Sequence, residues 1–257
     1  GLGFIVSNAS IRAKILKKIF IFFSKKLFKN NNIKIIFQNL DDYNLIQTYT
    51  KFEKTKSIII PGSGIDLKKV KYTPIRNNKK ITFLLVSRLL KDKGICEFIE
   101  ASNNILKNND KVNFIIIGDL DKNNPSFIDK TIIDSWIDNK NKFFKKYQQN
   151  IIEHIQNADV VVLPSYREGM PKILIEANAV GRPIITTNVP GCKECVIHGL
   201  NGFLCEAKNV YALTQAIKKI ILQRKNLRNM SKQSRLIAEN KFSINLVNNK
   251  HFEVYKQ

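Results

Sequence analysis

Two glutamates, Glu168 and Glu176, stand on either side of a Gly-Met-Pro turn in the segment YREGMPKILIEANAV, residues 166–180. Proline is favoured at the first position of a helix, so Pro171 predicts a helix that begins there. Glu168 then lies in the preceding loop and Glu176 about one and a half turns into the helix, so both carboxylates can face one cleft. They either accept hydrogen bonds from the hydroxyls of sugars, or they are helix charges, with Glu168 at an N-terminus where negative charge is favourable. The two acids alone do not decide between these two interpretations.

Basic side chains and a glycine turn accompany the acids. Arg88 directly follows the apolar run FLLVS, and Lys93 lies at the start of the next predicted helix. Two cations at such a place suit a diphosphate, which the helix dipole also attracts. The PGSG turn contains Gly62, Ser63 and Gly64, and its backbone N–H groups could contact a ligand that lies between two domains.

The elements that must position these residues alternate along the chain from residue 81. Apolar runs of strand length occur at 81–89, 111–119, 159–165, 182–188 and 202–207, and segments with helical spacing occur at 94–107, 150–158, 171–180 and 210–222. Strands without polar alternation are buried on both faces, which is typical of a parallel sheet covered by helices. The pattern predicts a doubly wound α/β domain, in which ligands bind at the carboxyl ends of the strands.

A second, smaller α/β unit precedes this domain. The segment IKIIFQNLDDYNLI predicts a strand and an Asp-capped helix, and SIIIPGSGID predicts a strand that ends in the glycine turn. The tract DNKNK, residues 138–142, predicts a solvated loop. We expect residues 1–75 to be the remnant of an amino-terminal domain, 76–235 the ligand-binding domain, and 236–257 a helix that returns to the first.

Composition bounds the class of protein. A hydrophobic fraction of 44% and a charged fraction of 25% are those of a soluble globular chain. The net charge of +22 suggests anionic partners, although the richness in Lys, Asn and Ile is also what AT-rich codons favour. The chain has no basic stripe with interleaved aromatic residues, so nucleic acid is not an expected partner.

Residues 15–28, ILKKIFIFFSKKLF, predict a basic amphipathic helix. Four lysines, Lys17, Lys18, Lys25 and Lys26, interrupt its apolar residues, so it cannot cross a bilayer. Either it packs on its own domain, or it lies on the surface of an anionic membrane.

Metal-binding patterns are weak. The spacing of Cys192, Cys195, His198 and Cys205 matches no common structural zinc site. The triplet Asp119-Leu120-Asp121 is a pattern that metal-dependent transferases of another fold use, but here it follows a predicted strand and is interpreted as a polar loop. We expect no metal, and the low cysteine count fits a reducing cytoplasm.

The order and spacing of SRLLKDKG, GDLD, ADVVVLPSYREGMPKILIEANAVGRPIITTNVPGCKE and HGLNGFL resemble those of the family-4 retaining glycosyltransferases. The resemblance covers residues 33–222, and the glutamate pair is its most specific element. PSYREGMP, GCKE, FQNLDD and PGSGID resemble the bacterial subgroup that builds capsule, lipopolysaccharide and lipid-linked oligosaccharide. It implies the GT-B fold: a complete carboxyl-terminal Rossmann-like domain with a parallel sheet, beside a partial amino-terminal α/β domain.

The resemblance also implies roles. Arg88 and Lys93 would bind the donor diphosphate, and Glu176 would hold the ribose hydroxyls. Glu168 would be the catalytic residue, placed against the donor sugar near the reacting carbon. The remaining donor contacts would come from the backbone of Gly169, Met170 and Pro171 and from the turn of Gly62, Ser63 and Gly64.

The expected activity is transfer of a sugar, with retention, from a nucleotide-sugar (a UDP-sugar) to a lipid-linked or polysaccharide acceptor. The donor is a substrate, so no cofactor is expected, and the leaving phosphate would take the acceptor proton. The enzyme would be cytoplasmic, with peripheral contact at the cytoplasmic face of the inner membrane. The alternative is a non-catalytic nucleotide-sugar-binding subunit, or an inactive fragment that needs a partner chain. The chain departs from the family at Lys146, where a glycine usually lies next to the base, and in lacking most of the amino-terminal domain.

Overall fold

The computed structural model of the chain describes residues 11–30, 32–138 and 140–256, apart from the side chains of residues 11–13. Its larger part is a six-stranded sheet in the order β5-β4-β3-β6-β7-β8, in which every neighbouring pair is parallel. The strands are β3 (Ile81–Val86), β4 (Val112–Ile117), β5 (Lys142–Lys145), β6 (Val160–Leu163), β7 (Ile184–Thr187) and β8 (Gly202–Cys205). The predicted parallel sheet and α/β class are therefore confirmed, whereas β5 was not predicted.

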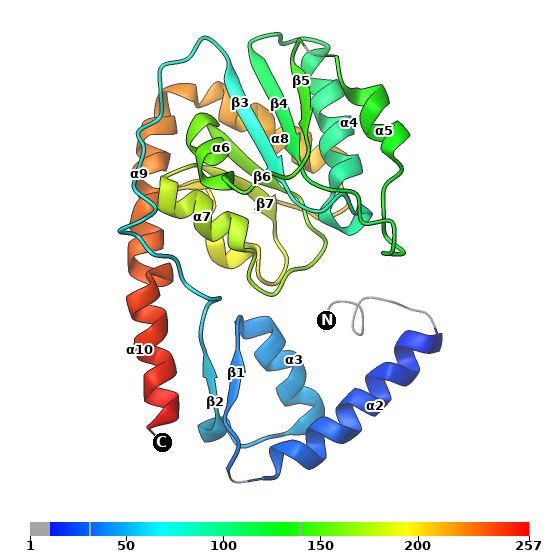
Figure 1. Ribbon diagram of the computed structural model, residues 1–257, viewed down its shortest axis with the longest axis vertical. Helices are drawn as coiled ribbons and strands as arrows, with labels where there is room; N and C mark the ends of the chain where they lie inside the picture. The colour runs from blue at the N-terminus through cyan, green and yellow to red at the C-terminus, as the bar shows by residue number, and fades with distance from the viewer. Residues whose placement is uncertain (1–10, 31, 139, 257) are drawn as a thin grey trace.

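Helices cover both faces of this sheet (Figure 1). They are α4 (Ile95–Leu106), α5 (Lys130–Trp136), α6 (Ile151–Asn157), α7 (Lys172–Val180), α8 (Val210–Leu222) and α9 (Leu227–Ile237). Successive residues of a strand point to opposite faces. Accordingly, Phe83 and Leu85 of β3 join the core beneath α4, α5 and α8, while Leu84 and Val86 join the core beneath α6 and α7.

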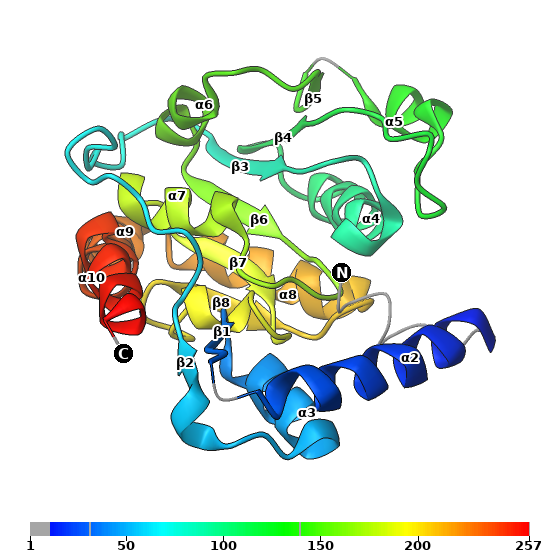
Figure 2. The ribbon, with the colours of Figure 1, turned by 60° about the horizontal axis from the view of Figure 1, so that its bottom comes forward.

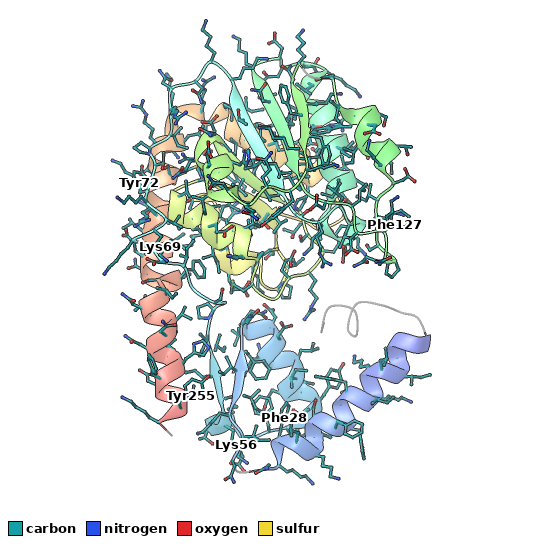
Figure 3. The ribbon with its side chains drawn as sticks, viewed as in Figure 1. Phe28, Lys56, Lys69, Tyr72, Phe127 and Tyr255 are labelled. Atoms are coloured by element: carbon teal, nitrogen blue, oxygen red, sulfur yellow. The ribbon has the colours of Figure 1, made fainter. Side chains whose placement is uncertain are left out.

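A smaller first lobe, residues 11–60, contains two parallel strands, β1 (Ile35–Phe37) and β2 (Ser57–Ile59). Helix α3 (Leu40–Thr50) connects them, a short turn (Lys54–Lys56) precedes β2, and α2 (Ile11–Phe28) packs against α3 (Figure 2). Phe28, at the end of α2, lies edge-on to Phe52 in the core of this lobe, with ring centroids 5.7 Å apart (Figure 3). None of the described helices is long and apolar enough to cross a membrane.

The N-cap of α3 differs from the prediction. Asn39, not an aspartate, occupies the cap, and its side-chain oxygen accepts a hydrogen bond from the Asp42 backbone N–H at 2.8 Å. Asp41 and Asp42 follow in the first turn, where their charge favours the helix terminus. Their carboxylates are thus left free to make contacts elsewhere.

The chain crosses between the first lobe and the second lobe, residues 81–242, at two places that lie side by side. The first crossing follows β2, and the second follows a π-helical turn (Ala238–Phe242) that separates α9 from α10 (Ile244–Tyr255). The Ile65 N–H donates to the Phe242 carbonyl at 2.8 Å, and the Ile244 N–H donates to the Ile65 carbonyl at 3.0 Å. From there α10 extends toward the level of the first lobe (Figure 1).

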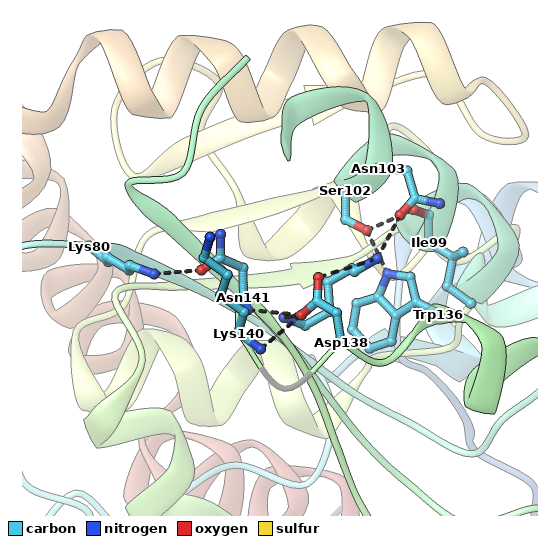
Figure 4. A network of polar contacts seen from close by, with 9 residues as sticks. Lys80, Ile99, Ser102, Asn103, Trp136, Asp138, Lys140 and Asn141 are labelled. Atoms are coloured by element: carbon cyan, nitrogen blue, oxygen red, sulfur yellow. Dashed lines mark hydrogen bonds and ion pairs between the residues drawn. The ribbon is translucent and has the colours of Figure 1, made fainter. Parts of the chain in front are cut away.

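A polar network anchors β5, the edge strand of the large sheet (Figure 4). One carboxylate oxygen of Asp138 accepts hydrogen bonds from the backbone N–H groups of Lys140, Asn141 and Lys142 at 2.9–3.0 Å. Beside it, the buried indole of Trp136 donates to the Ser102 hydroxyl at 2.8 Å. The DNKNK tract is therefore not only a solvated loop, because Asp138 organises the turn that starts β5.

Candidate functional site

The candidate site lies at the carboxyl ends of β3, β4, β6 and β7, which meet at one edge of the sheet. The loop from β6 to α7, residues 164–171, carries Glu168 there. Buried hydroxyls on β7 hold the start of this loop: Thr186 donates to the Leu163 carbonyl at 2.6 Å, and Thr187 donates to the Ser165 carbonyl. The loop that carries the acid is therefore built on rigid strands.

Glu168 contacts a lysine and a serine. The same oxygen, Oε1, lies 2.5 Å from Lys93 Nζ and accepts a hydrogen bond from the Ser165 hydroxyl at 2.8 Å. The Glu168 and Lys93 side chains are only 15% and 19% exposed. Pro171 is the N-cap of α7, and the structure gives this helix no side-chain cap. Glu168 thus makes no capping hydrogen bond to α7, and its side-chain contacts are instead with Lys93 and Ser165.

A glycine brings Lys93 to this position. Lys93 ends a single helical turn (Lys91–Lys93), and Gly94 follows with a left-handed φ of 74° at the start of α4. A Cβ on Gly94 would lie 2.2 Å from the Pro164 carbonyl oxygen. Only a residue without a side chain allows the start of α4 to approach the end of β6 so closely, and this approach sets the Lys93–Glu168 contact.

Arg88 and Lys93 do not share a partner. Arg88 is 60% exposed and donates to Asp121 at 2.8 Å, in the loop that follows β4. Asp119 of the same loop accepts a hydrogen bond from the Tyr147 backbone N–H at 3.2 Å. Among the described residues, no group of three or more His, Cys, Asp and Glu side chains is placed to hold a metal. The joint binding of a diphosphate by Arg88 and Lys93 stays a prediction.

Glu176 lies within α7 and is largely buried. Its carboxylate is 3.5 Å from Lys172 Nζ, one turn earlier on the same helix. Burial raises the pKa of Glu176, and the neighbouring Lys172 only partly opposes this rise. A desolvated carboxylate with so few donors around it has acceptor capacity that the hydroxyl groups of a ligand could use.

The predicted glycine turn of residues 62–64 divides between two neighbours. A Cβ on Gly62 would lie 2.8 Å from the Met170 side chain, whereas a Cβ on Gly64 would lie 2.9 Å from the Ile244 backbone. Ser63 between them is exposed. Gly62 therefore contacts the loop that bears Glu168, and Gly64 packs against the start of α10.

Contacts from the first lobe complete the surroundings of the Glu168 loop, and the sequence analysis did not assign them. Asn39 donates to the Gly169 carbonyl at 2.8 Å, and Asp42 forms an ion pair with Arg167. Asp41 lies 2.8 Å from Lys193. The sequence contains a possible signal for these contacts, because Asp41 and Asp42 are adjacent acids after a predicted strand and Arg167 is a cation next to Glu168. Nothing in the sequence shows that these residues pair.

A model of the family described as "Glycosyl transferases group 1" matches residues 68–236, a span that contains Glu168, Glu176, Arg88 and Lys93. The chain belongs to this family. The recognition made from the residue pattern is thereby confirmed.

Bacterial enzymes that act on lipid-linked sugars are among the relatives. The chain is 27% identical, over 99% of its length and 68% of the relative, to the N,N'-diacetylbacillosaminyl-diphospho-undecaprenol alpha-1,3-N-acetylgalactosaminyltransferase of Campylobacter jejuni. It is 32% identical, over 74% of its length, to the UDP-Gal:alpha-D-GlcNAc-diphosphoundecaprenol alpha-1,3-galactosyltransferase of Escherichia coli. The chain spans only 51% of the length of this second relative.

A solved glycosyltransferase structure shares the fold. The sucrose-phosphate synthase of Thermosynechococcus elongatus superposes with a TM-score of 0.82 at 21% identity, covering 100% of this chain and 66% of that one. The GT-B architecture is therefore confirmed, and the described structure corresponds to part of it.

Proposed function

We propose that this group 1 glycosyltransferase moves a sugar from a UDP-sugar to a lipid-linked or polysaccharide acceptor, with retention and without a metal. The observation that carries the proposal is the Glu168–Lys93–Ser165 cluster at the carboxyl end of the sheet. Ligands of open α/β sheets bind at this end. The names of the two relatives supply the substrate classes, since both act on sugars linked to diphospho-undecaprenol.

Lys93 can neutralise either the Glu168 carboxylate or the diphosphate of a bound donor. Without a ligand its ammonium neutralises the partly buried Glu168 carboxylate. A donor diphosphate would compete for this ammonium, and Arg88, which is exposed just after β3, would add a second cation. Fixed positive charge stabilises a departing diphosphate. Glu168, released from Lys93, would then contact the donor sugar.

Glu176 supports the same ligand from the neighbouring helix. Its pKa is raised by burial, so hydrogen bonds from ribose hydroxyls would stabilise its ionised form. With retention, the leaving phosphate would accept the proton of the acceptor hydroxyl, and no separate protein base is assigned. The donor is consumed as a substrate, so the proposal includes no cofactor.

The test is a transfer assay with a panel of nucleotide-sugars and a sugar linked to diphospho-undecaprenol as acceptor, with and without a chelator. We expect consumption of one UDP-sugar, an unchanged rate with the chelator, and a product whose anomeric configuration by NMR matches the donor. Inversion, dependence on a metal, or a preference for another nucleotide would contradict the corresponding part of the proposal. Binding of a donor without transfer would instead support the non-catalytic subunit.

We also propose that α2 rests on an anionic membrane at the cytoplasmic face. The helix packs inward through Phe20, Ser24 and Phe28, and Lys17 donates to the Tyr49 hydroxyl at 2.8 Å. Its outer side exposes apolar side chains beside a row of lysines: Ile15, Ile19, Phe22, Phe23 and Leu27 with Lys14, Lys18, Lys25 and Lys26. Apolar and basic side chains on one exposed side are the combination that binds the surface of a charged bilayer.

A further inference from the structure

The first lobe holds the Glu168 loop on both sides of the acid. Arg167, which precedes Glu168, forms an ion pair with Asp42, and the carbonyl of Gly169, which follows it, accepts a hydrogen bond from Asn39 at 2.8 Å. We name these four residues, Asn39, Asp42, Arg167 and Gly169, the interlobe clamp. Its two halves lie 125 and 130 residues apart in the sequence.

The clamp is an internally bonded network and not a surface ion pair. Asn39 is 1% exposed, and its amide group also donates to the Asp42 carboxylate at 2.9 Å. The side chains of Asp42 and Arg167 are 10% and 19% exposed. Removing one partner of a buried charge pair leaves the other uncompensated, so each member depends strongly on the rest.

Packing leaves the loop little freedom beside these bonds. A Cβ on Gly191 would lie 2.5 Å from the Gly169 carbonyl oxygen and 2.6 Å from the Glu168 carbonyl oxygen. From the second lobe, the Pro190 carbonyl accepts a hydrogen bond from the Glu168 backbone N–H at 3.2 Å. Lys193, at the end of this second-lobe segment, reaches Asp41 of the first lobe. The loop that carries Glu168 is thus held by contacts from both lobes.

We propose that the interlobe clamp positions Glu168, so that residues 38–42 of the first lobe set the geometry of an acid that the second lobe carries. The proposal rests on the catalytic role proposed for Glu168. Asn39 and Asp42 are positioning residues: they act through Arg167 and Gly169, and their contacts are with the protein. The side chains proposed to bind the diphosphate and ribose of the donor, Arg88, Lys93 and Glu176, are not members of the clamp, whereas the Gly169 backbone is expected to lie beside the donor sugar.

The first test is amide hydrogen exchange in the loop, measured on peptides that cover residues 164–172. Asp42→Asn and Asn39→Ala should both speed this exchange. Asn39→Ser should speed it too while preserving α3, because serine retains the capping oxygen but lacks the amide that reaches Gly169. Exchanging the two charges, Asp42→Arg with Arg167→Asp, should restore slow exchange only in part, because it re-forms the ion pair without the hydrogen bond from Asn39 to Asp42. The matched control is Asp134→Asn, which removes the carboxylate of an exposed ion pair on α5.

The second test separates positioning from folding by kinetics. Asp42→Asn should lower kcat by roughly 10- to 100-fold, the effect of a catalytic group displaced by about an ångström. The affinity for UDP, which carries no donor sugar, should be unchanged, and the charge exchange should recover part of kcat. Unchanged loop exchange in Asp42→Asn overturns the clamp whatever the turnover, and faster exchange with full kcat overturns its positioning role. If the unaltered protein transfers no sugar, the proposed function fails, and the exchange experiment still decides whether the clamp holds the loop.

Discussion

At the scale of single residues, the short contact between Glu168 and Lys93 dominates the site. Each charge is mostly removed from water, and each satisfies the other at 2.5 Å. Taking one away leaves a cation or an anion that a ligand must then satisfy. The two residues should therefore respond to mutation in opposite ways.

Lys93→Ala should weaken UDP binding by about 1.5–3 kcal/mol, the usual contribution of a hydrogen bond to a charged group. Glu168→Gln should preserve or strengthen UDP binding, because it frees the Lys93 ammonium, while it lowers kcat. Calorimetry with UDP measures the first effect and turnover measures the second. Lys91→Ala, an exposed lysine of the same turn, is the control. Weaker UDP binding in Glu168→Gln would contradict this division.

The raised pKa of Glu176 predicts a proton linkage. Burial raises the pKa in the free protein, and hydrogen bonds from ribose hydroxyls would favour the ionised form and lower it again. UDP binding should then release protons on the acid side of neutrality, and UDP affinity should rise with pH through the raised pKa. Calorimetry in buffers of different ionisation enthalpy detects the released protons. Their persistence in Glu176→Gln would assign the linkage to another group.

At the scale of elements, the contact between α4 and α5 lies beside the turn that starts the edge strand β5 (Figure 4). Trp136 of α5 is buried, and its indole N–H donates to the Ser102 hydroxyl of α4 (Figure 4). Ser102 in turn donates to the Ile99 carbonyl at 2.7 Å. Ser102 thus links the buried indole of α5 to the backbone of α4.

Ser102→Ala should destabilise the protein by about 1–3 kcal/mol, because it leaves the buried indole N–H without its acceptor. Ser135→Ala is a matched control, since its exposed hydroxyl also donates to the carbonyl three residues earlier, at 3.0 Å. Its effect should stay within about 0.5 kcal/mol, as for most surface substitutions. Denaturant unfolding measures both free energies. Equal losses would show that the indole bond contributes nothing.

The elements also show where prediction from sequence works. The five apolar strands were predicted because burial on both faces makes them continuous runs. The edge strand β5 escaped because lysines flank its two phenylalanines and it is only half-buried. Helix α9 escaped because Ser231 and Ser234 occupy its buried face, where they donate to the Gly181 and Arg182 carbonyls.

The site was predicted in part for a related reason. Glu168, Glu176 and Lys93 stand in local patterns that carry both chemistry and a family resemblance. The Asp42–Arg167 pair joins segments 125 residues apart, and only the arrangement of the lobes brings them together. Arg182 is a similar case: burial lowers its pKa to about 10, and it donates to the carbonyls of Thr73, Ile155 and Gln156. No local pattern announces a buried arginine of this kind.

At the scale of the whole molecule, α2 makes the membrane proposal testable. Phe22 and Phe23 are 65% and 62% exposed. Within the described part of the chain, the nearby Lys18, Lys25 and Lys26 are exposed and form no ion pair, so neutralising them should not disturb the fold. Lys17 is excluded from the test because it packs on Tyr49.

Replacing Lys18, Lys25 and Lys26 with Gln should abolish co-sedimentation with anionic vesicles at low salt, because each lysine near such a surface contributes about 1 kcal/mol. The unaltered protein should bind these vesicles and dissociate as the salt concentration rises. The control carries the same change at three exposed lysines of the second lobe, Lys107, Lys122 and Lys232. Equal loss in both variants would show that net charge alone drives binding, and no loss in either would refute the role of α2.

The paired crossings of the chain at Ile65 and Ser243 give the molecule a pivot. The two crossings are bonded to each other through backbone groups, so the lobes can turn about this point more easily than they can slide or separate. Gly62 contacts Met170 only three residues before the pivot, so a turn displaces the Glu168 loop very little. Helix α2, at the far end of the first lobe, would be carried furthest (Figure 1). If α2 rests on a bilayer as proposed, the first lobe is the fixed base, and the second lobe, which we propose binds the donor, is the part that turns.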